Sequence, residues 1–539
     1  MRLKRYLLSL CIVIVGGAFF GSAVMAQNTS WQCPTDLTLR LAWLTSENAA
    51  GLTTLSANDK ASEVSLYGEL FSGDMHNYNE AHDGYRWGLK GVSYYPVSEC
   101  VAVWGEVNYC NFQGNDMTGS YFIDPSQVPF NLIEYTEGNP GDKQLETYHL
   151  AGAVGANFSR RFSGGLKMDY TAANYAKRKD LRHTNSLMDM TVTAGLKYRL
   201  AERFTLGVNY VYRRRNESLL LSMYGTTDKL YYTLVDYGAF FGKRELFSDT
   251  GYTKENEAKP LFDAYHGVAL QFSWRIGKYW EWFNEVGFRL RDGFYGDDSP
   301  STIVYSAHTG ESLTYRGHLV YAGLRNTHTL RVTAEQCKVE NRENIYDFRN
   351  DDVGINYYVY LGDTEVGTRT EQKISLQYTG LLGIEQGLPL WMLDIKLDYD
   401  HREQKAVNYP DYRRQDIAWW RLAASLKRNI LSGRNLYTAG VDFGYGAGSG
   451  DRCKDGRFTT SNEVETLTRT LDMLLMRDYE YHTASRIQAG ANIRYTRHIG
   501  QKGVRGYVEL NYNFCKAFNT TYLNDAMRHI LLLQIGCNF

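Results

Sequence analysis

The feature that most constrains this chain is a strict alternation of apolar and polar residues, repeated many times along its length. In residues 486–495 every second residue is apolar, and the residues between them are polar or glycine. Residues 504–514, 391–399 and 204–212 repeat the pattern, with Val, Leu, Ile, Phe, Tyr or Trp in the apolar positions. Successive side chains of a β-strand point to opposite faces, so each segment predicts a strand with one apolar and one polar face.

The length of these segments favours a membrane over water as their surroundings. They run for about 10 to 14 residues, which a tilted strand needs to cross a bilayer, whereas strands of soluble sandwiches have about five or six. The polar faces carry charges of both signs, as the wall of a wet lumen does. Tyr (42 residues) outnumbers Phe (23), and Tyr suits the interface between lipid and water. We therefore expect an all-β fold, a transmembrane antiparallel up-and-down β-barrel in a Gram-negative outer membrane.

The alternating segments number about 18, with 16 and 20 as close alternatives, and they occupy residues 61–539. The connections between them alternate between short and long, and the long ones are 113–144, 216–262, 341–369 and 447–483. Outer-membrane barrels have short periplasmic turns and long extracellular loops, which places both termini in the periplasm. Within the last long loop, helical spacing predicts a short helix, and the alternative is an extra hairpin. The residues with this spacing are Leu467, Leu471, Leu474 and Leu475.

The first 26 residues have the pattern of a secretory signal peptide. Basic residues precede an apolar run from Leu7 to Phe20, and small residues place the cleavage site after Ala26. The run is short for an ordinary membrane-spanning helix, although a retained anchor is the alternative. Residues 27–60 then form a periplasmic N-terminal segment, and its apolar residues between Leu37 and Leu44 need burial. A plug inside the lumen would bury them; the alternative is an ordinary periplasmic lead-in.

The stretch Asn48-Ala49-Ala50-Gly51-Leu52 stands just before the first predicted strand. It is similar to the Asn-Pro-Ala-Gly-Leu stretch of the long-chain fatty-acid transporter family, in which an N-terminal hatch plugs the lumen and apolar ligands pass through the barrel. The resemblance implies a plug, with Asn48, Gly51 and Leu52 as its candidate residues. This chain departs from the family in having Ala49 in place of proline and in its larger expected number of strands.

Residues 531–539 place apolar side chains at alternate positions and end with Phe539. They resemble the C-terminal strand through which the insertion machinery recognises outer-membrane proteins. Over residues 61–539 the chain resembles the broad class of large, porin-like Gram-negative outer-membrane β-barrels. The resemblance implies outer-membrane lipid as a partner, and the insertion machinery as another through Phe539.

Charged residues on the polar faces could form a constriction that filters solutes by charge and size. The alternative is that they form cross-strand ion pairs that brace the wall. These lumen candidates are Arg86, Lys90, Glu281, Glu285, Arg289, Asp394, Lys396 and Asp398. A basic cluster at a predicted extracellular strand end could bind phosphates of lipopolysaccharide, or could be a solvated loop. Its members are Lys177, Arg178, Lys179 and Arg182.

Several other classes of function find no support in the sequence. The formal net charge is −1 at pH 7, without the clustered basic face that nucleic-acid binding requires. One of the eight cysteines, Cys11, lies in the signal peptide, and an odd number remains at wide spacing. We therefore expect neither a disulfide framework nor a metal site. No catalytic arrangement or cofactor motif is recognisable, so we expect neither an enzyme nor a cofactor.

These patterns favour passage of a small solute across the outer membrane, by diffusion or by a gated, plugged route. Only residues 27–60 precede the barrel, far fewer than in the plug domain of TonB-dependent transporters, so direct TonB-driven transport is not expected. One alternative is a structural barrel that holds a surface lipoprotein or transporter as its partner. The other is an enzyme at the rim. The sequence does not indicate which solute would pass.

Overall fold

The computed structural model describes most of the chain after residue 32. The described residues are 33–135, 139–225, 228–248, 250–299, 302–350, 356–385, 387–460, 468–499, 503–523 and 526–539. The predicted signal peptide, residues 1–26, lies outside the described residues.

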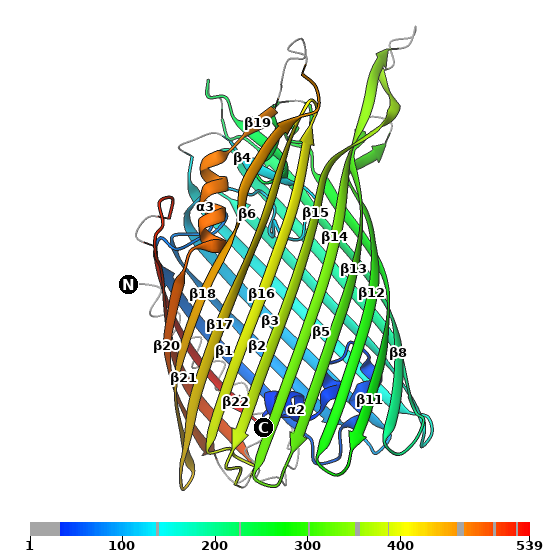
Figure 1. Ribbon diagram of the computed structural model, residues 1–539, viewed down its shortest axis with the longest axis vertical. Helices are drawn as coiled ribbons and strands as arrows, with labels where there is room; N and C mark the ends of the chain where they lie inside the picture. Colours follow the sequence, from blue (N-terminus) through cyan, green and yellow to red (C-terminus); the bar gives the residue numbers. More distant parts are fainter. Residues whose placement is uncertain are drawn as a thin grey trace.

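Eighteen strands form one closed antiparallel barrel (Figure 1). The sheet closes where β1 (Ala61–Ser72) pairs with β22 (Met527–Asn538) on one side and with the next strand of the chain on the other. Closure pairs both edges of each barrel strand, which is what a sheet in lipid requires. The predicted fold class and the expected number of strands are confirmed.

The other barrel strands follow one another around the wall in chain order. They are β2 (Asp83–Pro96), β3 (Val101–Met117), β5 (Gly141–Asn157), β6 (Phe162–Lys177), β7 (Arg182–Arg199), β8 (Phe204–Ser222), β11 (Lys259–Ile276), β12 (Trp280–Ser299), β13 (Thr302–Ala322), β14 (Asn326–Asn350), β15 (Asn356–Leu382), β16 (Trp391–Asn408), β17 (Asp411–Ser432), β18 (Asn435–Arg457), β20 (Arg486–Ile499) and β21 (Val504–Ala517).

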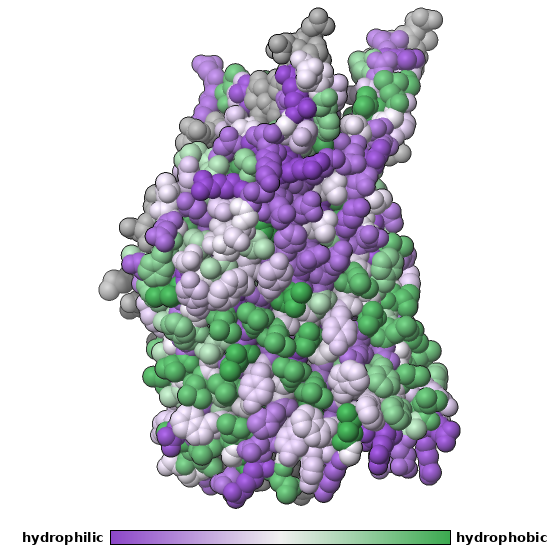
Figure 2. All heavy atoms as spheres, in the orientation of Figure 1, coloured by the Kyte–Doolittle hydropathy of each residue, from purple (hydrophilic) through white to green (hydrophobic). Residues whose placement is uncertain are grey.

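The outward-facing side chains form an apolar belt around the barrel. On three different strands Leu270, Val441 and Ile493 are 63%, 61% and 64% exposed. Figure 2 shows apolar residues gathered on the half of the barrel that carries the short turns, and mostly polar residues beyond them. An exposed apolar surface of this extent is stable against lipid rather than against water. The alternation seen in the sequence therefore separates a lipid-facing side from a lumen-facing side.

The barrel has a turn end, where the connections are short, and a loop end, where they are long. At the turn end Phe539 and Ser62 exchange two backbone hydrogen bonds of 3.0 Å. At the loop end several strands continue further than the sequence predicts. Of residues 341–369, predicted as a loop, 341–350 belong to β14 and 356–369 to β15, whereas 351–355 lie outside the described residues. The two strands stay paired and project beyond their neighbours (Figure 1). Outside lipid the backbone ladder needs no apolar face, so alternation does not mark where such strands end.

Three of the long loops build a cap at the loop end. A small sheet has the order β19–β10–β9–β4. It contains β4 (Asn131–Glu134), β9 (Tyr232–Gly238), β10 (Phe241–Leu246) and β19 (Thr468–Thr470), and helix α3 (Asp472–Thr483) follows β19. Leu132, Val235 and Phe241 belong to a buried apolar cluster beneath this sheet. Of the predicted helical stripe, Leu474 and Leu475 lie in α3 and Leu471 is its N-cap, whereas Leu467 lies outside the described residues. We call this sheet together with α3 the cap.

Residues 33–60 lie inside the lumen at the turn end, and we call them the plug. They contain α2 (Pro34–Arg40) and the 3-10 helices η2 (Ala42–Thr45) and η3 (Ala49–Thr54). Figure 1 shows α2 enclosed by the barrel wall. Leu37 and Leu52 pack in one buried cluster with apolar residues of β1, β2 and β3. Among the described residues, no helix is long and apolar enough to span a membrane.

Candidate functional site

The plug rests on glycines contributed by four neighbouring strands, β5 to β8. A Cβ added to Gly165 would lie 2.4 Å from backbone atoms of Ala49 and Ala50. A Cβ added to Gly195 would lie 2.1 Å from Oδ1 of Asn48. Only glycine lets two backbones approach so closely. We call these residues the glycine shelf: Gly155, Gly165, Gly195 and Gly207.

Asn48 fixes the plug to the shelf. Its side-chain amide nitrogen lies 2.9 Å from the carbonyl oxygen of Leu196, 3.2 Å from that of Val208 and 3.0 Å from Oε1 of Gln271. Its Oδ1 accepts a hydrogen bond of 3.0 Å from the backbone N–H of Ala50, at the start of η3. Asn48 is only 1% exposed. One buried amide therefore joins the plug directly to the backbone of β7 and β8.

Glu47 and Trp43 fix the other side of the plug to β11, β12 and β13. The carboxylate of Glu47 accepts hydrogen bonds from Arg289 at 2.5 Å and from Arg316 at 3.0 Å. Trp43 Nε1 donates to the Ser273 hydroxyl at 2.9 Å. Burial alone would raise the pKa of Glu47, but the two arginines outweigh it and hold the pKa below its usual value. Glu47 therefore stays ionised and anchors the plug by charge.

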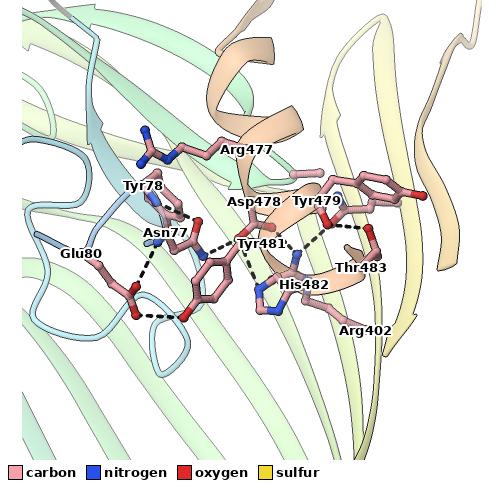
Figure 3. Close-up of polar contacts among 12 residues, drawn as sticks. Asn77, Tyr78, Glu80, Arg402, Arg477, Asp478, Tyr479, Tyr481, His482 and Thr483 are labelled. Carbon is pink, nitrogen blue, oxygen red and sulfur yellow. Dashed lines mark hydrogen bonds and ion pairs between the residues drawn. The ribbon is translucent and has the colours of Figure 1, made fainter. Parts of the chain in front are cut away.

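At the loop end, Asp478 ties α3 to the barrel (Figure 3). Its carboxylate accepts hydrogen bonds from Arg402 of β16 at 2.5 Å and from the Asn77 amide, in the loop after β1, at 2.8 Å. His482, one turn along α3, lies 3.4 Å away. Burial alone would raise the pKa of Asp478, but Arg402 and then His482 hold the pKa well below the ordinary carboxyl value. Asp478 therefore stays ionised and holds α3 to the barrel by charge.

Two further contacts join α3 to neighbouring loops. The Glu480 carboxylate accepts hydrogen bonds from three backbone N–H groups in the loop before β22. The donors are Thr521, Tyr522 and Leu523, at 2.9, 2.7 and 3.1 Å. Arg477 donates to Nε2 of His76 at 2.7 Å, in the loop after β1. Burial and the charge of Arg477 lower the pKa of His76 to about 4. The helix therefore connects three parts of the loop end in one polar network.

A cavity of about 580 Å³ lies in the lumen against β13 to β17 and β20. Tyr481 and His482 of α3 line it on the cap side, and Arg316, which binds Glu47 of the plug, lines it on the turn-end side. A second cavity, of about 410 Å³, lies under the cap. They share five lining residues, so we treat them as one chamber. The shared residues are Lys373, Asp400, Trp419, Tyr481 and His482.

The chamber wall is a row of inward side chains set by strand register. Glu335, Lys373, Asp400 and Trp419 are directly opposite one another across β14, β15, β16 and β17. The Lys373 ammonium lies 3.1 Å from Glu371. Residues directly opposite in a sheet are neighbours on one face, so this row presents both signs of charge to the lumen. Such a wall can bind polar solutes and water.

The sequence matches one family over residues 49–539, described as "Family of unknown function (DUF6850)". The chain belongs to this family. The match takes in η3 of the plug, all eighteen barrel strands and the cap. A search of curated proteins finds no match.

Solved structures with a similar fold include three iron-related outer-membrane proteins at low sequence identity. BauA, the ferric preacinetobactin receptor from Acinetobacter baumannii, is 7% identical, with a TM-score of 0.40, over 89% of this chain and 80% of its own. The ferric citrate transporter FecA is 9% identical, with a TM-score of 0.38, over 89% and 79%. FpvA from P. aeruginosa, bound to a heterologous pyoverdine, is 10% identical, with a TM-score of 0.39, over 89% and 72%.

In this DUF6850 member, two of the predicted lumen residues lie beneath the plug. Glu285 accepts hydrogen bonds from Ser46 at 2.5 Å and from Arg316 at 2.7 Å, and Arg289 binds Glu47. Glu281 is on the same strand, half-buried nearer the turn end. The role of Glu285 and Arg289 in this structure is to hold the plug.

The other predicted lumen residues lie on the walls beside the plug. Lys396 and Asp398 line the chamber and form an ion pair of 2.9 Å. The Asp394 carboxylate accepts hydrogen bonds from neighbouring β15 side chains. Arg86 and Lys90 lie 3.3 and 3.7 Å from Glu69 and Glu106 on adjacent strands. The structure therefore distributes the eight candidates around the wall instead of gathering them in one constriction.

The predicted lipopolysaccharide contact is wrong for Lys177. Its side chain is fully buried, and its ammonium donates to Glu134 of the cap at 2.7 Å. The reason is that β6 extends to Lys177, and the small sheet of the cap covers it. Arg178 and Lys179 are exposed at the same strand end, and Arg182 pairs with Asp180 at 2.9 Å.

Asp74, His76 and His82 form a small cluster at the loop end that could hold a metal ion, because their ligand atoms lie within 4.8 Å of one another. His82 already bonds to Asp74 at 2.8 Å, and Arg477 occupies Nε2 of His76. The cluster is therefore satisfied by protein partners. The seven described cysteines are free thiols.

Sequence reasoning missed the residues that hold the plug and the cap. Asp478 and Glu480 lie in a segment recognised only by its leucines, and no local pattern shows that their partners come from β16 and the loop before β22. The glycine shelf did leave a signal. Gly165, Gly195 and Gly207 stand at inward positions of three consecutive strands, where polar side chains would be expected.

Proposed function

We propose that this protein lies in a Gram-negative outer membrane with its loop end outside, and passes a small polar solute through the chamber. The observation that carries the proposal is a charged, water-accessible chamber of about 580 Å³, with the plug on its turn-end side and the cap on its loop-end side. The orientation rests on the rule that outer-membrane barrels carry their long loops outside. Passage on this route is gated, because the solute has to displace the cap and then the plug.

The plug is suited to such movement by the way it is attached. Polar contacts of Asn48, Glu47 and Trp43 fix it to β7, β8 and β11 to β13, whereas its apolar side chains pack on β1 to β3. Hydrogen bonds and ion pairs of this kind can exchange with water when the plug shifts, whereas a large apolar interface would have to be exposed. The plug can therefore open a path while its chain stays connected to β1.

Single-channel recording in planar bilayers tests the proposal. We expect rare openings of the wild-type chain, and more frequent openings when Glu47→Gln removes the charge that holds Arg289 and Arg316. Arg325→Gln is the control: it also removes one charge, but from an exposed turn-end side chain that does not contact the plug. A wild-type chain and an E47Q variant that both stay silent at all voltages would contradict passage through the lumen.

A second candidate function is a barrel that holds a surface partner. The β14–β15 hairpin favours it, because Phe348, Tyr360 and Leu361 are 58%, 53% and 60% exposed on a hairpin that projects beyond the barrel. Clustered exposed apolar side chains of this kind mark interaction surfaces. Co-purification from native membranes tests the candidate, with a hairpin variant F348S/Y360S as the comparison. A barrel that is isolated alone in both forms would argue against it.

A further inference from the structure

A small cavity of about 110 Å³ lies in the lumen wall, between β8 and β15 and under the loop that follows β3. It is lined by an unusual number of cationic side chains. These are Arg213, Arg289, Arg291, Arg369 and Lys373. We call this cavity the arginine pocket.

Two of its guanidinium groups are fixed from behind. Arg213 donates to Asp189 through Nε and Nη2 at 2.9 and 2.6 Å, and Arg291 donates to Asp263 through Nε at 2.6 Å. The Tyr265 ring lies between them, 5.0 Å from one guanidinium and 5.5 Å from the other. Among the described residues, nothing bonds to Nη1 of either arginine. Each therefore keeps a donor group for the pocket.

The third arginine is held even more loosely. Arg289 uses only Nη2, to bind Glu47 of the plug. Its Nε and Nη1 have no hydrogen-bond partner among the described residues. The donors of the arginine pocket thus exceed the acceptors that the described protein supplies. Arginine forks are well suited to bind carboxylate and phosphate groups.

Carboxylates also border the pocket and pair with its cations. Two inward carboxylates, Glu335 and Glu371, line it together with the five cations. Glu371 is already shared between Arg369 at 3.3 Å and Lys373 at 3.1 Å. Glu311 also borders the cavity, but strand alternation places its side chain on the outward face of β13. Together with Asp189, Asp263 and Glu47, which hold three of the arginines, these carboxylates equal the five cations in number, so the pocket offers unused guanidinium donors rather than a net positive charge.

We propose that the arginine pocket binds the carboxylate or phosphate group of the solute that passes through the barrel. Its volume corresponds to a few water molecules at roughly 30 Å³ each, which suits one oxyanion group and excludes a larger part of the solute. Glu335 and Lys373 line both the pocket and the chamber, so the rest of the solute lies in the chamber. This inference rests on the proposed function and specifies the solute as a small organic acid or phosphate ester.

Calorimetric titration of the full chain in detergent with inorganic phosphate, and separately with acetate, tests the pocket. We expect wild-type binding of at least one anion, and the anion that binds more tightly identifies the source of the charge. The variant R213Q/D189N removes an ion pair as a unit, so it leaves no buried carboxylate unpaired. It should bind about tenfold or more weakly, because a charge-assisted hydrogen bond is lost. R325Q, outside the lumen, should bind as wild type.

A second variant keeps the test independent of that pair. Ser312 lines the pocket from β13, and Ser312→Glu places a carboxylate of the protein itself among the arginines. We expect S312E to fold with a higher melting temperature than wild type and to lose the further stabilisation that phosphate gives wild type. No binding of either anion to wild type, or equal binding by wild type and S312E, overturns the inference.

Conductance separates this inference from the function on which it rests. A barrel that conducts but binds neither phosphate nor acetate overturns the anion pocket and leaves passage standing. A barrel that binds phosphate but never conducts overturns passage, and with it the assignment of the pocket to a passing solute.

Discussion

The glycine shelf gives a sharp test of how the plug is docked. Gly165→Ala adds a Cβ that would lie 2.4 Å from backbone atoms of Ala49 and Ala50, which cannot rotate away as a side chain would. Gly152→Ala on β5 is the matched control, because the nearest atom to its Cβ is the Trp104 carbonyl oxygen at 3.9 Å. The two variants make the same change of residue type on adjacent strands. Only one of them touches the plug.

The size of the effect follows from the contact. Overpacking of a tight site costs about 1–3 kcal/mol, and here the strain is relieved when the plug lifts from the shelf. The hydrogen bonds of Asn48 oppose lifting, but neither substitution changes a residue that makes them. A change of 1.4 kcal/mol is a factor of ten in an equilibrium constant, so G165A should raise the ratio of displaced to docked plug by roughly 5- to 150-fold.

Limited trypsin digestion measures that ratio, because cleavage after Arg40 in α2 requires the plug to leave its folded position. We expect G165A to be cut faster than wild type by the same factor, and G152A to be cut at the wild-type rate. Opening frequency in planar bilayers should rise in G165A alone. Equal cleavage rates in G165A and G152A would refute the idea that close backbone approach docks the plug.

Three other predictions concern α3, the loop after β1 and the apolar belt. Asp478→Asn breaks a buried ion pair at a cost of about 3–5 kcal/mol. Amide hydrogen exchange in α3 should therefore accelerate while the barrel strands stay protected. Unchanged exchange in α3 would show that Asp478 does not hold the helix to the barrel. The pKa of His76 is lowered from 6.5 to about 4, so the folded state resists protonation of this side chain. The stability of the loop after β1, measured by hydrogen exchange, should therefore be full above pH 6.5 and fall towards pH 4. In H76Q this stability should not change with pH over the same range. Leu270→Arg places a charge in the belt and should cost about 2–4 kcal/mol in refolding into lipid, whereas Leu361→Arg on the projecting hairpin should cost little.

Strand-by-strand alternation predicted the barrel because a membrane imposes it at every residue of the crossing. Lipid on one side and water on the other leave a period of two in segments such as 486–495, and the segments 204–212, 391–399, 486–495 and 504–514 all lie in observed strands. The rule ends where the lipid ends. Residues 341–350 and 356–369 carry no such alternation, yet they remain paired, because water can solvate either face of these strands.

The site could be predicted only in part, because register across the barrel decides which lumen residues meet. The sequence places Arg289 on a polar face, but not beside Glu47 of the plug. Likewise Lys177 looks like an exposed lysine in a basic run, and its burial depends on a strand of the cap that comes from a distant loop. Contacts between elements far apart in the chain leave no local pattern in either case. The fatty-acid transporter likeness of residues 48–52 is not supported by the comparisons, although these residues do lie in the plug.

The glycine shelf also has a mechanical consequence. Along β5 to β8 glycines occupy inward positions of the wall, and the backbone of η3 fills the space that larger side chains would have occupied. The plug therefore supports β5 to β8 from inside as well as blocking the lumen. Removing the plug completely would leave these four strands without packing on their inner face. The least costly way to open a path is therefore to slide the plug sideways along the glycines while it stays in contact with the wall.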